Sequence, residues 1–364
     1  MRPRKFTAVA EQITKLIGQK RLGDGSALPS QNEIAAKFKV SRSCVQKALG
    51  VLCERGIVES RPGRGVFVRK TARARRRVRS LVYIVPEYLR TGEHPLDNYG
   101  LDILLGIESG ARDRDAAFVL RRYARDELGD LPSAVSRLKA DGIVANSSVP
   151  DDTLEALSRL GAPVVLAGRQ SAVAGVGHAV PNYYDYFHQT ATRLIGDGYR
   201  RVCLLFAQAH PSGPDMRAAL ERVRSERKKA EISIVDYSRG DPLYDFNTAD
   251  DEAVPAAVAE VLRAGEAPQV FLCNTDWIAW RTIMALQEAG LRVPEDVGVI
   301  GCLGMDLSEQ NTPTISTLAL DAQEMGRQAV AMLARMVERG AQPRIERVPF
   351  AFVERESFSW KAKT

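Results

Sequence analysis

The chain has few of the residues that metal and disulfide sites require. Its 364 residues include five cysteines and four histidines. The histidines show no HExxH or other ligand spacing, and the cysteines never form a CxxC pair. We therefore expect no metal and no cofactor, reduced cysteines packed as small core residues, and a cytoplasmic protein. The cysteines are Cys44, Cys53, Cys203, Cys273 and Cys302.

Long apolar runs are also missing. No run approaches the roughly 18 apolar residues that a membrane-spanning helix needs. In residues 1–20, Val9, Ile13, Leu16 and Ile17 recur at helical spacing, without the continuous apolar core of a signal peptide. The beginning of the chain is therefore predicted to be an amphipathic helix, and we expect no membrane partner.

Charge is divided unevenly along the chain. Residues 1–80 hold 20 Lys and Arg against 5 Asp and Glu, whereas the remainder holds 31 against 40. The overall net charge of +6 thus combines +15 at the N-terminal end with −9 in the rest. A basic segment on an acidic body is the electrostatic footprint expected of a nucleic-acid-binding domain.

The segment from Leu28 to Val68 has the pattern of a winged helix-turn-helix. Ser30 and Glu33 form a capping box that opens a short helix, and Ser41 can cap a second helix after a tight link. In the second helix four apolar residues recur at helical spacing: Val45, Ala48, Leu49 and Leu52. Two short strands, Ile57–Glu59 and Val66–Val68, then flank a turn rich in glycine and arginine. An ordinary helical domain with a hairpin is the alternative.

The second helix presents a polar and basic first turn, which is what the DNA major groove accepts. The wing glycines let one backbone approach another, and the wing arginines supply charge for phosphate or minor-groove contact. The predicted DNA-binding residues are Ser30, Gln31, Asn32, Ser41, Arg42, Ser43, Gln46, Lys47, Gly63, Arg64 and Gly65.

Residues from about Lys5 to Val68 resemble the N-terminal domain of the GntR family of bacterial transcription regulators. The resemblance rests on LPSQNEIAAKFKVSRSCVQKAL and the GRGVFV wing, which follow that family's LPSExxLAxxxxVSRxTVRxAL and GxGTFV. Gln31 replaces the usual acid, Cys44 the usual threonine and Gln46 the usual arginine. Because phosphate contacts position a protein and base contacts specify the sequence, loss of the arginine should change the operator rather than abolish binding.

After a basic linker, residues 70–80, the pattern changes to apolar runs alternating with helical stretches. This alternation predicts an α/β body, residues 81–364, with two parallel sheets covered on both faces. The expected helices are Leu101–Arg112, Asp152–Leu160, Tyr186–Asp197, Ala253–Arg263, Trp277–Ala289 and Gln323–Glu338. The expected strands are Leu81–Val85, Ala117–Leu120, Gly142–Ala145, Val164–Ala167, Val202–Phe206, Ile232–Val235, Val270–Cys273 and Gly298–Gly301.

Ligands of open parallel sheets bind outside the carboxyl ends of the strands. The residues that follow the expected strands here are polar, with two arginines, one acid and aromatic rings, a set that suits hydroxyl or carboxylate groups. They include Tyr99, Asn146, Arg169, Arg217, Thr275, Asp276 and Leu303.

Residues from Ser80 to about Arg355 resemble the effector-binding domain of the LacI family, which is related to periplasmic sugar-binding proteins. The most specific stretch is Val270–Gly326, colinear with that family's ANDxxAxG, VPxDxxVxGFDD and TPPLTT motifs. The resemblance implies effector contacts at Asp276, Arg217, Arg169, Asn182 and, near the first loop, Tyr99. The family's GFD motif is Gly301-Cys302-Leu303 here, so a carboxylate that commonly binds sugar hydroxyls is absent. This departure favours a modified sugar, a glycoside or another metabolite over a simple sugar as the effector.

Structural roles are open alternatives for the same residues. Asp276 can cap the helix that begins at Trp277, Arg217 can pair with Glu221 at i+4, and Arg169 can be an exposed loop residue. Each of these structural roles is an alternative to contact with the effector.

The two resemblances together imply a ligand-responsive transcription regulator. We expect a homodimeric repressor of carbohydrate-utilisation genes that binds double-stranded operator DNA and is released by a sugar-like effector. The alternatives are the same architecture sensing a non-sugar metabolite, a GntR-headed enzyme, and a transport-type solute receptor, against which the basic head and the lack of a signal-peptide pattern argue. No GxGxxG, GxxxxGK or GxSxG turn follows a strand, which argues against the enzyme.

Overall fold

The computed structural model describes residues 5–19, 22, 25–54, 57–62, 64–68, 77–87, 99–208, 210, 212–239 and 250–360. The chain divides into two compact units, a head (Met1–Arg76) and a body (Arg77–Thr364), and each is described by itself. The division falls within the predicted linker, of which residues 70–76 lie outside the described residues. No helix of the described residues is long and apolar enough to cross a bilayer.

The head consists of three helices followed by a hairpin, as predicted. The elements are α1 (Lys5–Gln19), α2 (Gln31–Phe38), α3 (Arg42–Glu54), β1 (Val58–Arg61) and β2 (Gly65–Val68). β1 and β2 pair antiparallel, with Val58 opposite Val68 and Arg61 opposite Gly65. The apolar faces of the helices and the hairpin enclose one small core that includes Ile13, Ile34 and Leu52. The winged helix-turn-helix prediction is confirmed, although β1 runs two residues beyond the expected Glu59.

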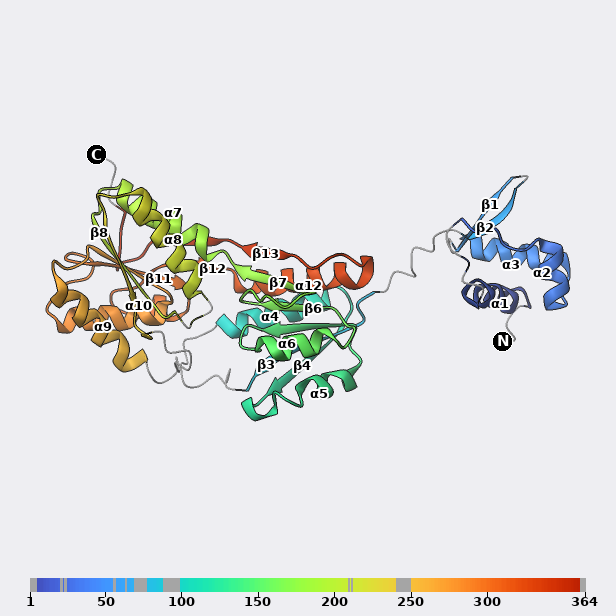
Figure 1. The fold of residues 1–364 in the computed structure, drawn as a ribbon, viewed down its shortest axis with the longest axis horizontal. Helices are drawn as coiled ribbons and strands as arrows, with labels where there is room; N and C mark the ends of the chain where they lie inside the picture. The colour runs from blue at the N-terminus through green and yellow to red at the C-terminus, as the bar shows by residue number, and fades with distance from the viewer. Residues whose placement is uncertain are drawn as a thin grey trace. The chain divides into compact units, whose positions relative to one another are not determined.

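The body contains two six-stranded sheets, as expected, each in its own lobe (Figure 1). The sheet of the first lobe has the strand order β13-β7-β6-β5-β3-β4. All of its neighbouring strands are parallel. The strands are β3 (Ser80–Pro86), β4 (Ala117–Tyr123), β5 (Gly142–Asn146), β6 (Val164–Ala167), β7 (Val176–Pro181) and β13 (Ile345–Val348).

The sheet of the second lobe has the order β14-β12-β11-β10-β8-β9. Its neighbouring strands are parallel except for β12 and β14, which run antiparallel. The strands are β8 (Arg201–Phe206), β9 (Glu231–Asp236), β10 (Val270–Cys273), β11 (Gly298–Leu303), β12 (Ser316–Leu320) and β14 (Phe350–Val353).

Helices cover the sheets of both lobes. Because the helices shield both faces of the central strands, β5, β6, β10 and β11 are buried throughout. The helices of the first lobe are α4 (Tyr99–Arg112), α5 (Leu131–Leu138), α6 (Asp151–Ser158) and α12 (Ala322–Arg339), with the 3-10 turn Arg125–Glu127. Those of the second lobe are α7 (Tyr183–Gly196), α8 (Gly213–Glu226), α9 (Asp250–Ala264), α10 (Asp276–Glu288) and α11 (Leu307–Gln310).

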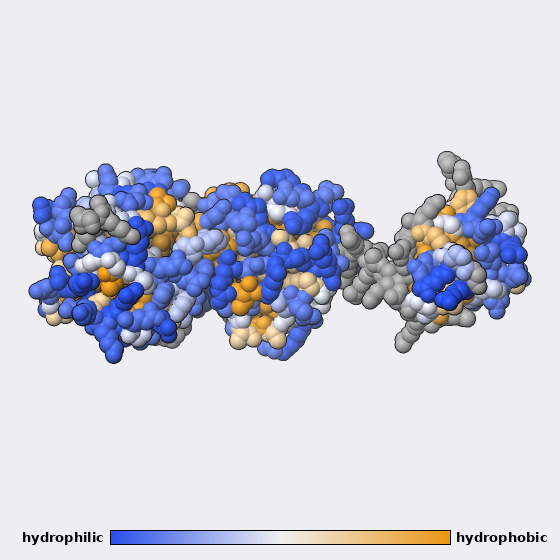
Figure 2. All heavy atoms as spheres, turned by 90° about the horizontal axis from the view of Figure 1, so that it is seen from above, coloured by the Kyte–Doolittle hydropathy of each residue, from blue (hydrophilic) through white to orange (hydrophobic). Residues whose placement is uncertain are grey.

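The expected strict alternation of strand and helix is wrong in two places. β7 follows β6 without a helix, and β13 leads directly into β14. The chain passes between the lobes three times: after β7, after β12 and after β13. These passages put the starts of α7 and of α12 at the junction of the lobes. Figure 2 shows a surface that is mostly hydrophilic, with apolar side chains gathered in small patches.

Candidate nucleic-acid interface and effector site

The turn between α2 and α3 is built from local hydrogen bonds. The Ser30 hydroxyl accepts the Glu33 backbone N–H at 3.2 Å, and the Ser30 N–H donates to the Glu33 carboxylate at 2.7 Å. The capping box is therefore confirmed. Lys39 ends α2 in the left-handed conformation with φ 53°, and the Ser41 hydroxyl then accepts the Cys44 N–H at 3.3 Å. These contacts fix the backbone of the turn that joins α2 to α3.

α3 has one buried face and one exposed face. The four residues predicted to pack inward, from Val45 to Leu52, are buried. Arg42, Ser43, Gln46 and Lys47 are exposed. The first turn of α3 holds no acidic residue, and among the described residues no ion pair engages Arg42 or Lys47. Within the described part of the head, this face therefore presents donors and positive charge without a paired acid.

The wing carries two further arginines, Arg61 and Arg64. The Arg61 guanidinium lies 4.6 Å from the centre of the Phe67 ring and forms an ion pair with Glu59 at 2.5 Å. Arg64 is exposed, and Gly65 has a φ of 107°, a conformation that favours glycine. The predicted contact Gly63 lies outside the described residues. Ser30 and Asn32 are exposed and Gln31 is half-buried at the start of α2.

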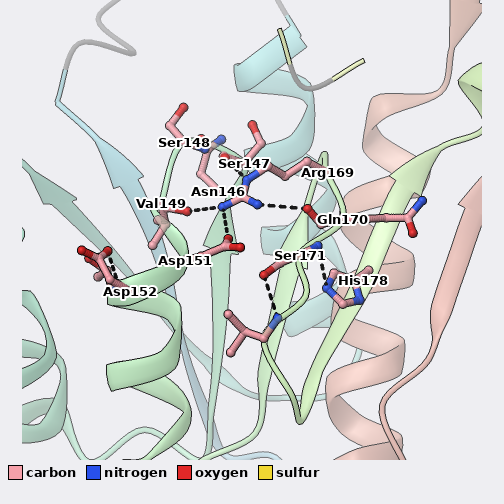
Figure 3. Close-up of polar contacts among 12 residues, drawn as sticks. Asn146, Ser147, Ser148, Val149, Asp151, Asp152, Arg169, Gln170, Ser171 and His178 are labelled. Atoms are coloured by element: carbon pink, nitrogen blue, oxygen red, sulfur yellow. Dashed lines mark hydrogen bonds and ion pairs between the residues drawn. The ribbon is translucent and has the colours of Figure 1, made fainter. Parts of the chain in front are cut away.

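In the first lobe, Arg169 organises the loop that follows β5 (Figure 3). Its guanidinium donates to the carbonyls of Ser147 and Val149, both at 2.7 Å, and to the Asp151 carboxylate at 2.7 Å. Its side chain is 19% exposed. The exposed-loop alternative for Arg169 is therefore wrong, and most of its donors bind within the lobe. A contact with an effector stays a prediction.

Other predicted residues of the first lobe lie around the same strand ends. Asn146 is buried; it donates to the Tyr83 hydroxyl at 3.3 Å and accepts the Ser148 N–H at 2.9 Å. Asn182 donates to the Asp185 carboxylate at 2.8 Å. The Tyr99 hydroxyl lies 3.6 Å from the position that a Cβ on Gly168 would occupy. The structure thus brings Tyr99 beside the loops after β5 and β6.

In the second lobe, Asp276 connects two loops. It is fully buried, and its Oδ2 accepts the Met305 N–H at 2.7 Å, which joins the start of α10 to the turn after β11. Burial raises the pKa of the Asp276 carboxyl to about 7, although the Thr317 hydroxyl, the backbone of Met305 and Gly304, and Arg355 oppose the rise. The helix cap is Thr275, whose hydroxyl accepts the Ile278 N–H at 3.2 Å. The capping alternative for Asp276 is therefore wrong.

Leu303 stands where the resemblance places a carboxylate. It is buried and has a φ of 97°, which is rare for a branched side chain and strains the backbone. The Asp276–Met305 hydrogen bond, two residues further on, holds this turn in place. Such strained positions cluster at ligand sites, so the turn after β11 remains a candidate effector contact.

Arg217 lies on an exposed part of α8. Its guanidinium forms an ion pair with Glu221 at 2.9 Å, and the side chain is 49% exposed. This is the helix-surface pairing that the sequence left open as the alternative. An effector contact by Arg217 stays a prediction.

Two residues that the sequence did not single out lie where the lobes join. Tyr183, the first residue of α7, is buried, and Asp215 lies in the first turn of α8. Burial raises the pKa of Tyr183 well above its ordinary range, and Tyr99, Cys302 and Asp215 raise it further. These influences come from both lobes, since Tyr99 belongs to α4 and Cys302 and Asp215 belong to the second lobe. Tyr183 could have been found from its position shortly after β7, but β7 itself was not predicted from the sequence.

Comparison with known proteins agrees with this geometry. Residues 6–68 match the bacterial regulatory proteins of the gntR family, and residues 191–358 match the periplasmic binding protein-like domain. The chain joins a gntR-family domain to a periplasmic binding protein-like domain. The arabinose metabolism transcriptional repressor of Geobacillus stearothermophilus is 24% identical over 354 residues, covering 94% of this chain and 93% of that protein. The chain is accordingly a transcription regulator of this two-domain type.

Two solved structures share the fold of this regulator. The complex of the transcriptional regulator CelR with cellobiose has a TM-score of 0.65 at 20% identity, covering 91% of this chain and all of that one. The lac repressor dimer bound to operator and an anti-inducer has a TM-score of 0.61 at 17% identity, covering 77% and 93%. These likenesses confirm the two-lobed parallel-sheet fold.

Proposed function

We propose that this regulator is a cytoplasmic, homodimeric repressor of carbohydrate-utilisation genes, which binds operator DNA through the head and is released by a sugar or sugar derivative bound by the body. The observation that carries the proposal is the exposed face of α3, with Arg42 and Lys47 unpaired within the described part of the chain. A helix of this kind, followed by a basic wing, fits the major groove. The names of the relatives, which concern arabinose and cellobiose, support a sugar as effector.

The body supports an effector site where the two lobes join. The carboxyl ends of β5, β6 and β11 carry Asn146, Arg169 and Leu303, and α10 begins with Thr275 as its cap. Without a carboxylate at Leu303, fewer acceptors are available for sugar hydroxyls. A glycoside or a modified sugar, with an apolar group against Leu303, therefore suits the site better than a simple sugar.

A dimer is supported by exposed apolar side chains of the first lobe. Leu101 and Leu105 on α4 are 48% and 44% exposed, and Val119 and Leu120 on the neighbouring edge strand β4 are 37% and 41% exposed. Apolar residues at an uncovered sheet edge favour contact with another copy of the chain. A dimer would present two heads to two half-sites of a palindromic operator.

An effector can control the heads only through its preference for one body conformation. A ligand held by both lobes stabilises the closed arrangement. Closure then changes the dimer interface of the first lobe and the spacing of the two heads. Half-sites match only one spacing, so the ligand releases the DNA.

The test is a gel-shift titration of the purified protein on DNA from its own upstream region, followed by a thermal-shift screen of sugars, glycosides and sugar phosphates. In Arg42→Ala, retardation should require about 5- to 150-fold more protein. It should be unchanged in Lys15→Ala, a control that removes an exposed cation from α1. A ligand that binds the native body raises its melting temperature and releases the DNA. No retardation in dilute buffer contradicts the proposal. Absorbance of a bound cofactor would favour the enzyme alternative.

A further inference from the structure

Gln46 occupies the centre of the exposed face of α3. It lies one turn after Arg42, and Ser43, Lys47 and Gly50 are the other exposed residues of this face. Four residues of helix advance about 6 Å, so the two side chains leave the same face about two base-pair steps apart. Among the described residues, no hydrogen bond engages the Gln46 amide, which leaves it available to an external partner.

The region around Gln46 leaves it room to reach a base edge. Gly50, one turn further on, has no side chain, and a Cβ added there would meet nothing within 4 Å. Internal packing therefore does not require this glycine, which costs about 1 kcal/mol relative to alanine in an exposed helix. The position one turn C-terminal to Gln46 therefore carries no side chain that would compete for the same bases.

The chemistry of the amide selects one base. A glutamine side chain offers an acceptor and a donor in one plane, which matches the N6 donor and the N7 acceptor of adenine. Guanine offers two acceptors, N7 and O6, and a guanidinium with two parallel donors matches them. Arg42 and Gln46 therefore differ in the purine that each can hold with two hydrogen bonds.

We propose that Gln46 reads an adenine in each operator half-site, and that Arg42 reads a guanine about two base pairs away. The inference rests on the proposed function, since it requires α3 to lie in the major groove. Gln46 stands where the GntR-family pattern has an arginine, so the base preference should depart from that pattern at this position.

The test is selection of binding sites from a random DNA library by the full-length protein, by Gln46→Arg and by Gln12→Arg. Gln12 is an exposed glutamine on α1, so its substitution makes the same chemical change away from α3. The wild type and Gln12→Arg should both enrich adenine at one position of each half-site. Gln46→Arg should enrich guanine at that position and leave the rest of the site unchanged.

Affinities for the two purines give the size of the effect. The wild type should prefer the adenine site by about 5- to 150-fold, the discrimination of one bidentate pair, and Gln46→Ala should lose this preference. A site that is identical for the wild type and Gln46→Arg overturns the inference, as does a wild-type preference for another base at the altered position. If the wild type enriches no sequence, the proposed function fails as well. Circular dichroism melting of each variant verifies that the head is folded.

Discussion

Replacing Asp276 with asparagine should change how the stability of the body depends on pH. The carboxyl is fully buried, and its pKa rises from 3.8 to about 7, mainly through burial. The folded body therefore holds a proton that the unfolded chain releases near pH 4. The stability associated with this proton is fully present below pH 4 and is lost as the pH rises through about 7.

The size of the effect follows from the two pKa values. The rise from 3.8 to about 7 corresponds to about 4 kcal/mol, of which about 3 kcal/mol is lost between pH 5 and pH 8. An amide does not titrate in this range, and its oxygen can still accept the Met305 N–H. Asp276→Asn should therefore gain about 3 kcal/mol relative to the wild type between pH 5 and pH 8.

Urea unfolding followed by tryptophan fluorescence measures this difference. All three tryptophans, Trp277, Trp280 and Trp360, belong to the body, so the signal reports the body alone. Asp296→Asn is the control, because hydrogen bonds from Arg292 lower the pKa of that carboxyl to about 2, well outside the range tested. Its profile should run parallel to that of the wild type. A parallel profile for Asp276→Asn would refute the reasoning from burial.

Three further predictions concern DNA binding and assembly. Arg42→Ala should cost about 1–3 kcal/mol on the selected operator in gel-shift titrations, and an equal loss on random DNA would show that Arg42 touches only phosphate. Lys47→Ala should weaken binding to all sequences and reduce the slope of log K against log salt by about 1, whereas an unchanged slope would remove it from the phosphate contacts. Leu105→Asp should convert the dimer to a monomer in analytical ultracentrifugation and weaken operator binding; a dimer that persists would contradict the assignment of this face.

The head could be predicted almost entirely from its sequence. Its capping box joins Ser30 to Glu33, three residues apart, and the inward face of α3 repeats at helical spacing. These interactions are local, so the residues that make them are visible in the order of the chain. The wing differed in the bounds of its strands: β1 covers Val58–Arg61 and β2 begins at Gly65, because the pairing of Arg61 with Gly65 extends the hairpin.

One side of each sheet was not predicted: β7 and β13 in the first lobe, and β12 and β14 in the second. β7 contains Gly177, His178 and Pro181, which interrupt an apolar run, and β13 is a short strand with an exposed isoleucine and two charged residues. These segments are strands because neighbours supply their hydrogen bonds: β7 pairs with β6, β13 pairs with β7, and β14 pairs antiparallel with β12. Local pattern carries no information about these partners.

The sequence alone determined the head, the central strands of both lobes and the residue types at the strand ends, because periodicity and capping act within a few residues. Tertiary structure alone decided what those side chains do. Arg169 binds the carbonyl of Ser147, 22 residues away, and Asp276 accepts the N–H of Met305, 29 residues away. Such partners depend on which loops the folded sheets bring together, and burial then sets the charge that each group carries.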